Sequence, residues 1–596
     1  MINEEVSYNN RIREKEERLN ILNKRYNLIS IIRLILGICF IGVIYYGYKK
    51  NFNSIFFVIE LIILIVFFVL AKIHEQIIYK KVFEERSIKL NKDDICRLNG
   101  EWRSFEDKGE EFLDLNHPFI NDLNIFGNAS FFQWINITGS SYGRKKLKDI
   151  LCNSGKTSKE EIIENQKVLK ELSNNIELRE NIYSALIKDN KKGFNEEDFI
   201  KFCEDENYSF LGNPLNLIRI LGPILTIIAF IFMIIGKMSF LYFLILFMAN
   251  LGILKLGNKD INKNLELFEN IKRSMGGYVK ALELIENSNF KTKKLNNIKD
   301  NLKDKEPASL SIKKLYNITS WLYDRRNIFY IVLNGMLYWD FQILYKTEKW
   351  RKSEGKKIRG YLESFGEFEA LESLSILARE RDGYVLPIIV ENFAIKGKEI
   401  SHPMIKGVAI SNDFNLDKEK RVALITGSNM SGKSTFLRTI GFNSFLSYLG
   451  LPVKAKEFSL PIMDIYSCMR TGDNLDENIS SFYAEILRVK MVVEAVKNDK
   501  KVLFLLDEIF KGTNSIDRHE GARVLINQLL KGKSMGLVST HDLELCTLEE
   551  RTKEIVNYNF REYYKNNKLE FDYKLRDGVS TTRNARYLMK MAGIDI

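Results

Sequence analysis

Four long apolar runs, arranged in two close pairs, interrupt a chain that is otherwise rich in charged residues. The first pair covers 28–48 and 54–71, and the second pair covers 215–235 and 239–257. Each run approaches the length of about 20 residues that an α-helix needs to cross the hydrocarbon core of a bilayer. A buried core helix could be as apolar as any one of these runs. Four runs in two pairs favour two transmembrane helical hairpins.

The remaining sequence changes its hydrophobic period along the chain. The segments 158–187 and 258–305 are charged and repeat Leu and Ile at helical spacing, which predicts long amphipathic helices. In the last third, the helical spacing gives way to short continuous apolar runs. These runs lie within 422–425, 501–508 and 535–540. Continuous runs of this kind are typical of strands in a parallel sheet that is covered on both faces. The pattern predicts a helical part followed by an α/β domain.

A glycine-rich loop follows the first of these strands directly. Residues 427–435 read Gly-Ser-Asn-Met-Ser-Gly-Lys-Ser-Thr, the G-x-x-x-x-G-K-S-T pattern of a phosphate-binding loop. Its glycines let the backbone curl so that successive N–H groups point at phosphates. The pattern alone could be an ordinary turn that opens a helix, but the motifs that follow favour ATP. The loop residues that we expect to contact the nucleotide are Gly427, Asn429, Met430, Gly432, Lys433, Ser434 and Thr435.

Two carboxylates end the second strand, and a histidine follows the third. Asp507 would hold Mg²⁺ together with the hydroxyl of Ser434, while Glu508 would polarise the attacking water as a general base. Lys433 would place its charge at the β- and γ-phosphates. His541 could contact the γ-phosphate and report its presence. We therefore expect Glu508, His541 and Lys433 to serve catalysis, and Ser434 and Asp507 to bind the metal ion.

These motifs together resemble the ATPase domain of the MutS family of DNA mismatch-repair proteins, a branch of the ABC-type ATPases. The family's phosphate loop, T-G-x-N-M-x-G-K-S-T, is matched by 426–435. Its D-E-x-x-x-G-T motif is matched by 507–513, its S-T-F-x-x-E motif by 480–485, with Ser for Thr, and its T-H motif by 540–541. His402-Pro403 ahead of the domain also fits. The resemblance implies an ABC-type P-loop ATPase domain with ATP and Mg²⁺ as cofactors.

The resemblance also implies partners and an upstream architecture. Two ATPase domains would pair head to tail as a homodimer, so that Ser480 and Ser481 reach the γ-phosphate held by the partner. On local sequence alone, a plain helix N-cap is the alternative interpretation of the two serines. The segment from 408 to 414 would pack on the adenine base. Weaker similarity over 120–213 and 258–395 implies the family's all-α core and the long lever helices that connect it to the ATPase domain.

The chain departs from the family near its amino terminus. Mismatch-reading members insert an aromatic residue of a Phe-x-Glu pair, carried by a small amino-terminal domain, into the duplex. Here the first hundred residues contain an apolar hairpin instead, and Phe365-Gly366-Glu367 falls in a predicted core helix. The family's carboxy-terminal helix-turn-helix is missing or stunted. These departures put mismatch recognition in doubt.

Charge supports a membrane topology with the ATPase domain in the cytosol. The 596 residues carry a net charge of +12, which suits nucleic acid or anionic lipid. Basic residues are frequent before the first apolar run, whereas the loop after it holds only Lys49 and Lys50, as the positive-inside rule requires. Arg33 and Arg219 lie near cytosolic ends and can snorkel, while Glu60 lies deeper in its span. We expect a multi-pass protein of the cell membrane.

The sequence leaves two functions open. The first is a membrane-anchored MutS-like ATPase with ATP-dependent DNA binding, favoured by the resemblance and the basic charge. The second is an ATP-driven membrane protein that uses a MutS-type dimeric ATPase without DNA, favoured by the absent reader domain and by the second hairpin, which stands where the family has a DNA clamp. A basic stretch over 346–359 could line a DNA path or contact lipid headgroups, but we favour a solvated helix face. The expected divisions are a charged cytosolic leader (1–27), transmembrane hairpin 1 (28–73), the first part of the core (74–213), transmembrane hairpin 2 (214–257), lever and core helices (258–395) and the ATPase domain (396–596).

Overall fold

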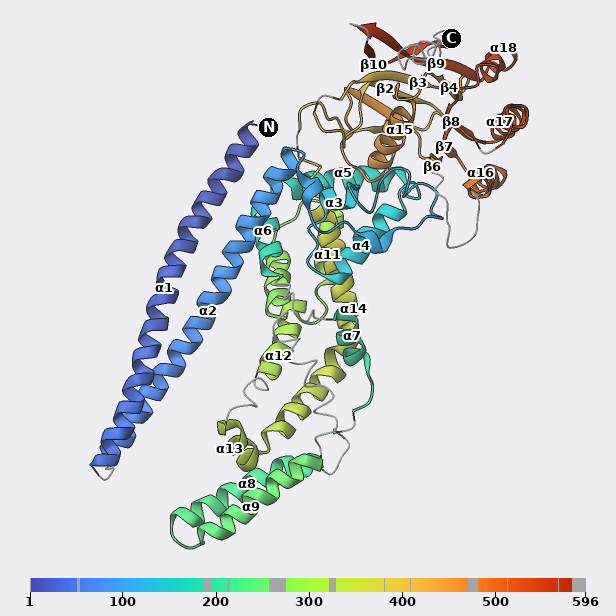
Figure 1. The fold of residues 1–596 in the computed structure, drawn as a ribbon. Helices are drawn as coiled ribbons and strands as arrows, with labels where there is room; N and C mark the ends of the chain where they lie inside the picture. The colour runs from blue at the N-terminus through green and yellow to red at the C-terminus, as the bar shows by residue number, and fades with distance from the viewer. Residues whose placement is uncertain are drawn as a thin grey trace.

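The described chain is elongated, with an α/β domain at one end and two apolar helical hairpins directed toward the other (Figure 1). The structure is a computed structural model. It describes residues 2–50, 54–186, 195–208, 210–211, 215–256, 275–320, 328–379, 381–407, 409–469, 481–511, 513–565 and 568–580. Helices dominate the described chain up to Ser375, and the first strand begins at Ile388. The mostly helical part and the α/β domain agree with the order that the sequence predicts.

The first hairpin consists of two very long helices, α1 (Ile2–Lys49) and α2 (Ser54–Leu98). At 1.5 Å per residue, α1 is about 70 Å long. It runs unbroken through the segment expected as a separate leader, since no Pro or Gly interrupts the helical pattern before Gly37. The apolar half of each helix lies next to the hairpin loop, and both helices are long and apolar enough to cross a membrane. The predicted boundary at residue 27 therefore falls inside a continuous helix.

The second apolar unit contains three helices rather than two. Its helices are α8 (Leu215–Ile234), α9 (Phe240–Leu256) and α13 (Ile328–Leu337). Buried Asn250 of α9 donates hydrogen bonds to Thr226 Oγ1 of α8 and to the carbonyl of Gly335 of α13, each at 2.8 Å. Helix α8 is long and apolar enough to span a membrane, and α9 is a shorter apolar helix. Helix α13 was not predicted, because its short apolar run does not stand out beside the longer ones.

A helical core packs around one long helix, α14 (Trp339–Ser375), which is about 55 Å long. The helices around it are α3 (Phe131–Ile135), α4 (Ser141–Cys152), α5 (Lys159–Asn174), α6 (Ile176–Ala185), α7 (Glu196–Glu204), a helix over 275–287, α11 (Lys293–Asn301) and α12 (Ala308–Ser320). The long helix expected over 158–187 is broken at Asn175, whose side chain caps α6. Gly366 lets α14 approach α4 closely, because a Cβ there would lie 2.7 Å from the backbone of Tyr142.

The basic stretch of α14 has two kinds of position. Lys346, Lys349, Lys352 and Lys356 are exposed, as on a solvated face. Trp350 is buried instead, and its indole N–H donates to the carbonyl of Ser311 at 2.9 Å. The stretch is thus a solvated face interrupted by a core contact.

The α/β domain contains two sheets. A six-stranded sheet has the order β10-β9-β4-β8-β7-β6, parallel except for β10, and a four-stranded sheet has the order β1-β5-β2-β3. The strands are β1 (Ile388–Ile389), β2 (Ile395–Ile400), β3 (Asn412–Leu416), β4 (Val422–Thr426), β5 (Glu457–Leu460), β6 (Asp464–Cys468), β7 (Val502–Asp507), β8 (Ser534–Ser539), β9 (Ile555–Lys565) and β10 (Lys568–Asp577). The helices are α15 (Lys433–Tyr448), α16 (Ser481–Lys497), α17 (Ser515–Leu530) and α18 (Leu548–Arg551).

Helices cover both faces of the six-stranded sheet. In β4, Ala423 and Ile425 belong to the apolar core that includes α15, whereas Val422 and Leu424 belong to the core that includes α16 and α17. Alternate residues of a strand point to opposite faces, so both sets must be apolar. This arrangement explains why these strands form continuous apolar runs in the sequence.

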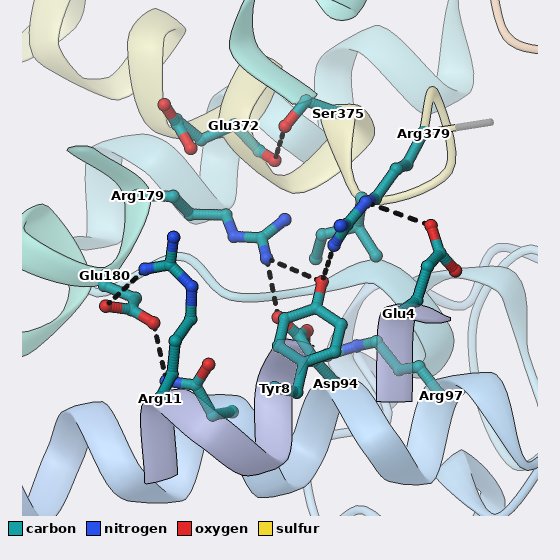
Figure 2. Close-up of polar contacts among 12 residues, drawn as sticks. Glu4, Tyr8, Arg11, Asp94, Arg97, Arg179, Glu180, Glu372, Ser375 and Arg379 are labelled. Carbon is teal, nitrogen blue, oxygen red and sulfur yellow. Dashed lines mark hydrogen bonds and ion pairs between the residues drawn. The ribbon is translucent and has the colours of Figure 1, made fainter. Parts of the chain in front are cut away.

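A buried polar network fixes the amino-terminal end of α1 to the helical core (Figure 2). The Tyr8 hydroxyl accepts hydrogen bonds from Arg379, just after α14, at 2.8 Å and from Arg179 of α6 at 3.4 Å. Arg179 also pairs with Asp94 of α2 at 2.6 Å, and Glu4 pairs with Arg379 at 3.0 Å. The end of the first hairpin that lies away from its loop is therefore joined to the segment that leads into the α/β domain.

Candidate functional site

Three neighbouring strands end beside one another and carry the residues that the sequence singles out. In the register of the sheet, Ser539 of β8 lies opposite Ile425 of β4 on one side and Asp507 of β7 on the other. The loop after β4, the carboxylates at the end of β7 and His541 after β8 therefore emerge at the same edge. Carboxyl ends of parallel strands are the usual place for a ligand in such a sheet.

The loop between β4 and α15 needs unusual backbone angles. Gly427, Met430 and Gly432 have φ of 147°, 66° and 110°. A Cβ on Gly427 would lie 2.7 Å from Ser431 Oγ, so that position requires glycine. Helix α15 begins directly after the loop, at Lys433. The loop thus ends on a helix N-terminus, where unpaired backbone N–H groups attract an anion.

The Lys433 side chain lies back over this loop and is only 4% exposed. Its Nζ donates to the carbonyl oxygens of Gly427 at 3.0 Å and Ser428 at 3.1 Å, and it lies 3.4 Å from Glu508 Oε1. Burial lowers the pKa of Lys433, and the negative charge of Glu508 opposes that effect. The ammonium group is therefore held beside the loop, where phosphate oxygens would compete with its present partners.

The carboxylate of Glu508 contacts several basic groups of the site. His541 Nε2 lies 2.7 Å from Glu508 Oε1, and Lys511 Nζ lies 2.8 Å from Glu508 Oε2. Burial alone would raise the pKa of Glu508, but hydrogen bonds from His541 and Lys511 outweigh it and hold the pKa well below the usual range. His541 Nε2 also lies 2.8 Å from Asn429 Oδ1. His541 Nε2 lies 3.4 Å from Lys433 Nζ as well. Because its pKa is held low, Glu508 is ionised at neutral pH.

Asp507 and Ser434 have the chemistry of magnesium ligands. Asp507 is the last residue of β7, and its Oδ1 accepts a hydrogen bond from the Ser539 hydroxyl. Ser434 is half-buried in the first turn of α15. Mg²⁺ prefers carboxylate and hydroxyl oxygens and keeps several waters, so one carboxylate and one hydroxyl beside a phosphate loop fit this ion.

An apolar pocket of about 320 Å³ adjoins the phosphate loop. Its wall includes Thr435 at the end of the loop, and Phe560 and Tyr573 from the antiparallel pair β9–β10. Of the segment expected to pack on adenine, Ala409, Ile410 and Asn412 line this pocket, whereas Val408 lies outside the described residues. Sequence reasoning missed Phe560 and Tyr573, because no local motif marks these aromatic residues within β9 and β10.

Helix α16 is fixed to the domain by two acidic contacts that the sequence analysis did not anticipate. The carboxylate of Glu485 accepts a hydrogen bond from the backbone N–H of Phe510. Arg488 pairs at 2.9 Å with Asp122, which is fully buried and also accepts from the Ser467 hydroxyl at 2.7 Å. These contacts connect α16 to the loop after β7 and to the helical part of the chain.

The structure leaves some predicted residues untested. Ser480 and Gly512 lie outside the described residues. Ser481 is the first residue of α16, and its side chain is also outside the description. The structure does bring together the loop from Gly427 to Thr435, the Asp507–Glu508 pair and His541.

Comparisons with known proteins agree with this geometry. Residues 423–595 match the family model described as MutS domain V. The chain is 27% identical to the DNA mismatch repair protein MutS of Listeria innocua over 260 residues, which are 42% of this chain and 30% of that protein. It is 32% identical over 240 residues to MutS of Thermotoga maritima, covering 39% of this chain and 30% of the relative. For MutS of Aquifex pyrophilus the identity is 30% over 234 residues, 38% of this chain and 27% of the relative.

The matches therefore span about 30% of the length of these relatives. The matching family model begins within β4, at the strand that leads into the phosphate loop, and covers the carboxylates of β7 and His541. Through this carboxy-terminal domain, the chain is similar to the MutS family.

Proposed function

We propose that this protein is a membrane-anchored ATPase of the MutS type that hydrolyses Mg²⁺-bound ATP at the carboxyl edge of its six-stranded sheet. One observation carries the proposal: Lys433, Glu508 and His541 meet within hydrogen-bond or ion-pair distance beside a glycine-dependent loop. Among the described residues, three apolar helices long enough to span a bilayer and the shorter apolar helix α9 support the anchor. The ATPase domain would lie in the cytosol.

Each residue has a defined task in this proposal. The γ-phosphate would compete for Lys433, whose present partners are two carbonyl oxygens and Glu508. Glu508, already ionised, would then accept a proton from the attacking water, while His541 holds its orientation. Ser434 and Asp507 would bind Mg²⁺, which supplies positive charge to the phosphate oxygens. Loop N–H groups from Gly427 to Gly432 would bind the phosphates. The side chains of Asn429 and Thr435 would lie beside the phosphates.

Adenine would occupy the apolar pocket next to the loop. Aromatic rings from Phe560 and Tyr573 and the aliphatic side chain of Ile410 suit a flat, weakly polar base. His402, which also lines this pocket, stacks on Phe442 at 5.1 Å, and burial lowers its pKa to about 3. It would therefore present a neutral ring to the base.

A homodimer would complete the site. By the family resemblance, Ser480 and Ser481 at the start of α16 would contact the γ-phosphate of the partner subunit. Glu485 and Arg488 support this role, because they fix the orientation of the helix that carries these serines.

DNA is the proposed macromolecular partner, since the relatives are named as DNA mismatch repair proteins and the chain is basic. A second function is favoured by the three-helix apolar unit at the far end of α14, which would let the ATPase act on the membrane without DNA. The test is the ATPase rate of the full chain in detergent or lipid nanodiscs, with and without duplex, mismatched or branched DNA, at physiological salt.

Stimulation by DNA at physiological salt supports the first function, and the preferred DNA structure identifies its substrate. Basal hydrolysis that no DNA alters supports the second. Absence of hydrolysis in wild type, with Lys433→Ala binding ATP as well as wild type, contradicts both.

A further inference from the structure

A polar cluster lies where the charged and apolar halves of the first hairpin meet. Ser30 Oγ of α1 is 3.0 Å from Nε2 of His74 on α2, and Arg33 Nη1 is 3.2 Å from Nδ1 of the same ring. Tyr26 stacks on that ring with centroids 4.4 Å apart. Both helices therefore build the cluster, and His74 fixes the position of Arg33.

The guanidinium of Arg33 has donors to spare. Nη1 contacts His74, and Nε is buried without a hydrogen-bond partner among the described residues, so Nη2 is the donor left open to a ligand. The group lies 4.9 Å from the ring of Phe67, which supports it from the apolar side. An arginine fork with free donors matches the oxygens of a phosphate group.

An open apolar groove of about 500 Å³ begins at this cluster and follows α1 toward the hairpin loop. Leu34, Ile38 and Ile41 of α1 and Phe67 of α2 line it. The groove is open at Gly37, where a Cβ would meet no atom within 4 Å. A polar head above an apolar groove has the shape and chemistry of a phospholipid.

We propose that this cluster and groove bind one anionic phospholipid, with its headgroup phosphate on Arg33 and Ser30 and an acyl chain along Gly37. The proposal rests on the membrane anchoring proposed above. Charge favours an anionic lipid, because the neighbouring turns of both helices hold five further basic residues against one acid, Glu75. The basic residues are Lys24, Arg25, Lys72, Lys80 and Lys81.

The experiment compares lipids directly. The full chain is reconstituted in phosphatidylcholine vesicles with spin-labelled phosphatidylglycerol or spin-labelled phosphatidylcholine, and the motionally restricted fraction of each label is measured by electron paramagnetic resonance. Wild type is expected to retain phosphatidylglycerol preferentially. Arg33→Gln should reduce that preference about fivefold, the effect of one basic charge near a lipid surface. Gly37→Leu should reduce retention of both labels, because its side chain fills the groove.

Two control variants match these changes. Gly42→Leu adds the same side chain to the same helix, again where a Cβ meets nothing within 4 Å, and Arg13→Gln removes a charge that is 83% exposed, far from the cluster. Both should behave as wild type. Equal retention of the two labels by wild type, or an unchanged preference in Arg33→Gln, overturns the lipid site. Failure of the wild-type chain to float with the vesicles overturns the membrane anchor as well, so the two failures are distinguishable.

Discussion

At the scale of single residues, Glu508 cannot keep its ion pairs and also bind the attacking water with the same oxygens. Its carboxylate now holds Lys433 and His541, yet the proposed reaction needs the same oxygens for a water molecule. Bound nucleotide would resolve this conflict, because its γ-phosphate would bind Lys433 and so release Glu508 from that ion pair. The described site is therefore internally neutralised, which keeps a cluster of buried charges stable when no phosphate is bound.

Glu508→Gln should bind ATP but hydrolyse it about 10²–10⁴-fold more slowly, the usual contribution of a general base. Nucleotide binding should survive, because the loop and Lys433 are unchanged. Single-turnover hydrolysis and fluorescent-nucleotide binding measure the two effects separately. Glu520→Gln is the matched control, since Glu520 is exposed on α17 and pairs only with nearby Arg523 among the described residues. Equal turnover of Glu508→Gln and wild type would exclude Glu508 as the base.

Glu372 predicts a pH dependence of stability. It is buried in α14, neither carboxylate oxygen has a hydrogen-bond partner among the described residues, and burial raises its pKa from 4.5 to about 8. The unfolded chain loses this proton at lower pH than the folded chain. Between about pH 4.5 and 8, the group therefore lowers the free energy of unfolding by about 1.4 kcal/mol for each pH unit.

Glu372→Gln should remove that loss, so the variant should melt at a higher temperature than wild type at pH 8 and at a similar temperature at pH 5. Thermal unfolding of the full chain in detergent measures both. Glu367→Gln on the same helix is the control, because Glu367 is 29% exposed and pairs with Lys294. A pH-independent difference between Glu372→Gln and wild type would contradict the assignment.

At the scale of elements, α16 contacts both the α/β domain and the helical part of the chain. Glu485 connects it to the loop after β7, and Arg488 connects it to Asp122 in the helical part. If the start of α16 contacts a partner's nucleotide, a movement there would reach the helical part through Arg488.

Arg488→Ala should lower the free energy of unfolding by about 3–5 kcal/mol, because it removes the guanidinium that pairs with the buried Asp122 carboxylate. It should also slow hydrolysis while nucleotide binding is retained, since the phosphate loop does not contact Arg488. Lys490→Ala, on the same helix with its side chain 65% exposed, should change neither property. Normal hydrolysis in Arg488→Ala would show that α16 needs no such support.

Elements that depend on local pattern could be predicted, and those that depend on distant partners could not. The strand ending at Thr426 and the loop after it follow from a continuous apolar run and a glycine pattern. The Arg488–Asp122 pair joins residues 366 positions apart, and no local period records such a partner. The change from charged to apolar residues near position 28 resembles a boundary, yet helix propensity is continuous there and α1 does not break.

At the scale of the whole molecule, the α/β domain and the apolar hairpins lie at opposite ends of the helical core (Figure 1). With the hairpins in a bilayer, the ATPase domain would be held away from the membrane by a distance comparable to the length of α14, about 55 Å. That clearance leaves room for a second copy of the domain to pair with the first.

Pairing should depend on bound ATP. We expect Glu508→Gln with ATP and Mg²⁺ to shift the detergent-solubilised protein from monomer toward dimer, because unhydrolysed ATP would remain between the two ATPase domains. Lys433→Ala should stay in the nucleotide-free distribution under the same conditions. Light scattering coupled to size-exclusion chromatography measures the mass. A mass that ATP leaves unchanged in both variants would contradict pairing through the nucleotide.

The network around Tyr8 has a consequence for how the chain is made. Tyr8 and Arg379 are 371 positions apart, so the amino-terminal end of α1 leaves the ribosome long before its partner exists. At a synthesis rate of about 5–20 residues per second, this interval lasts roughly 20–70 seconds. During that time, Tyr8 and Asp94 lack part of their final environment, although the first hairpin is already complete. The first residues to be synthesised are thus among the last to reach their native contacts.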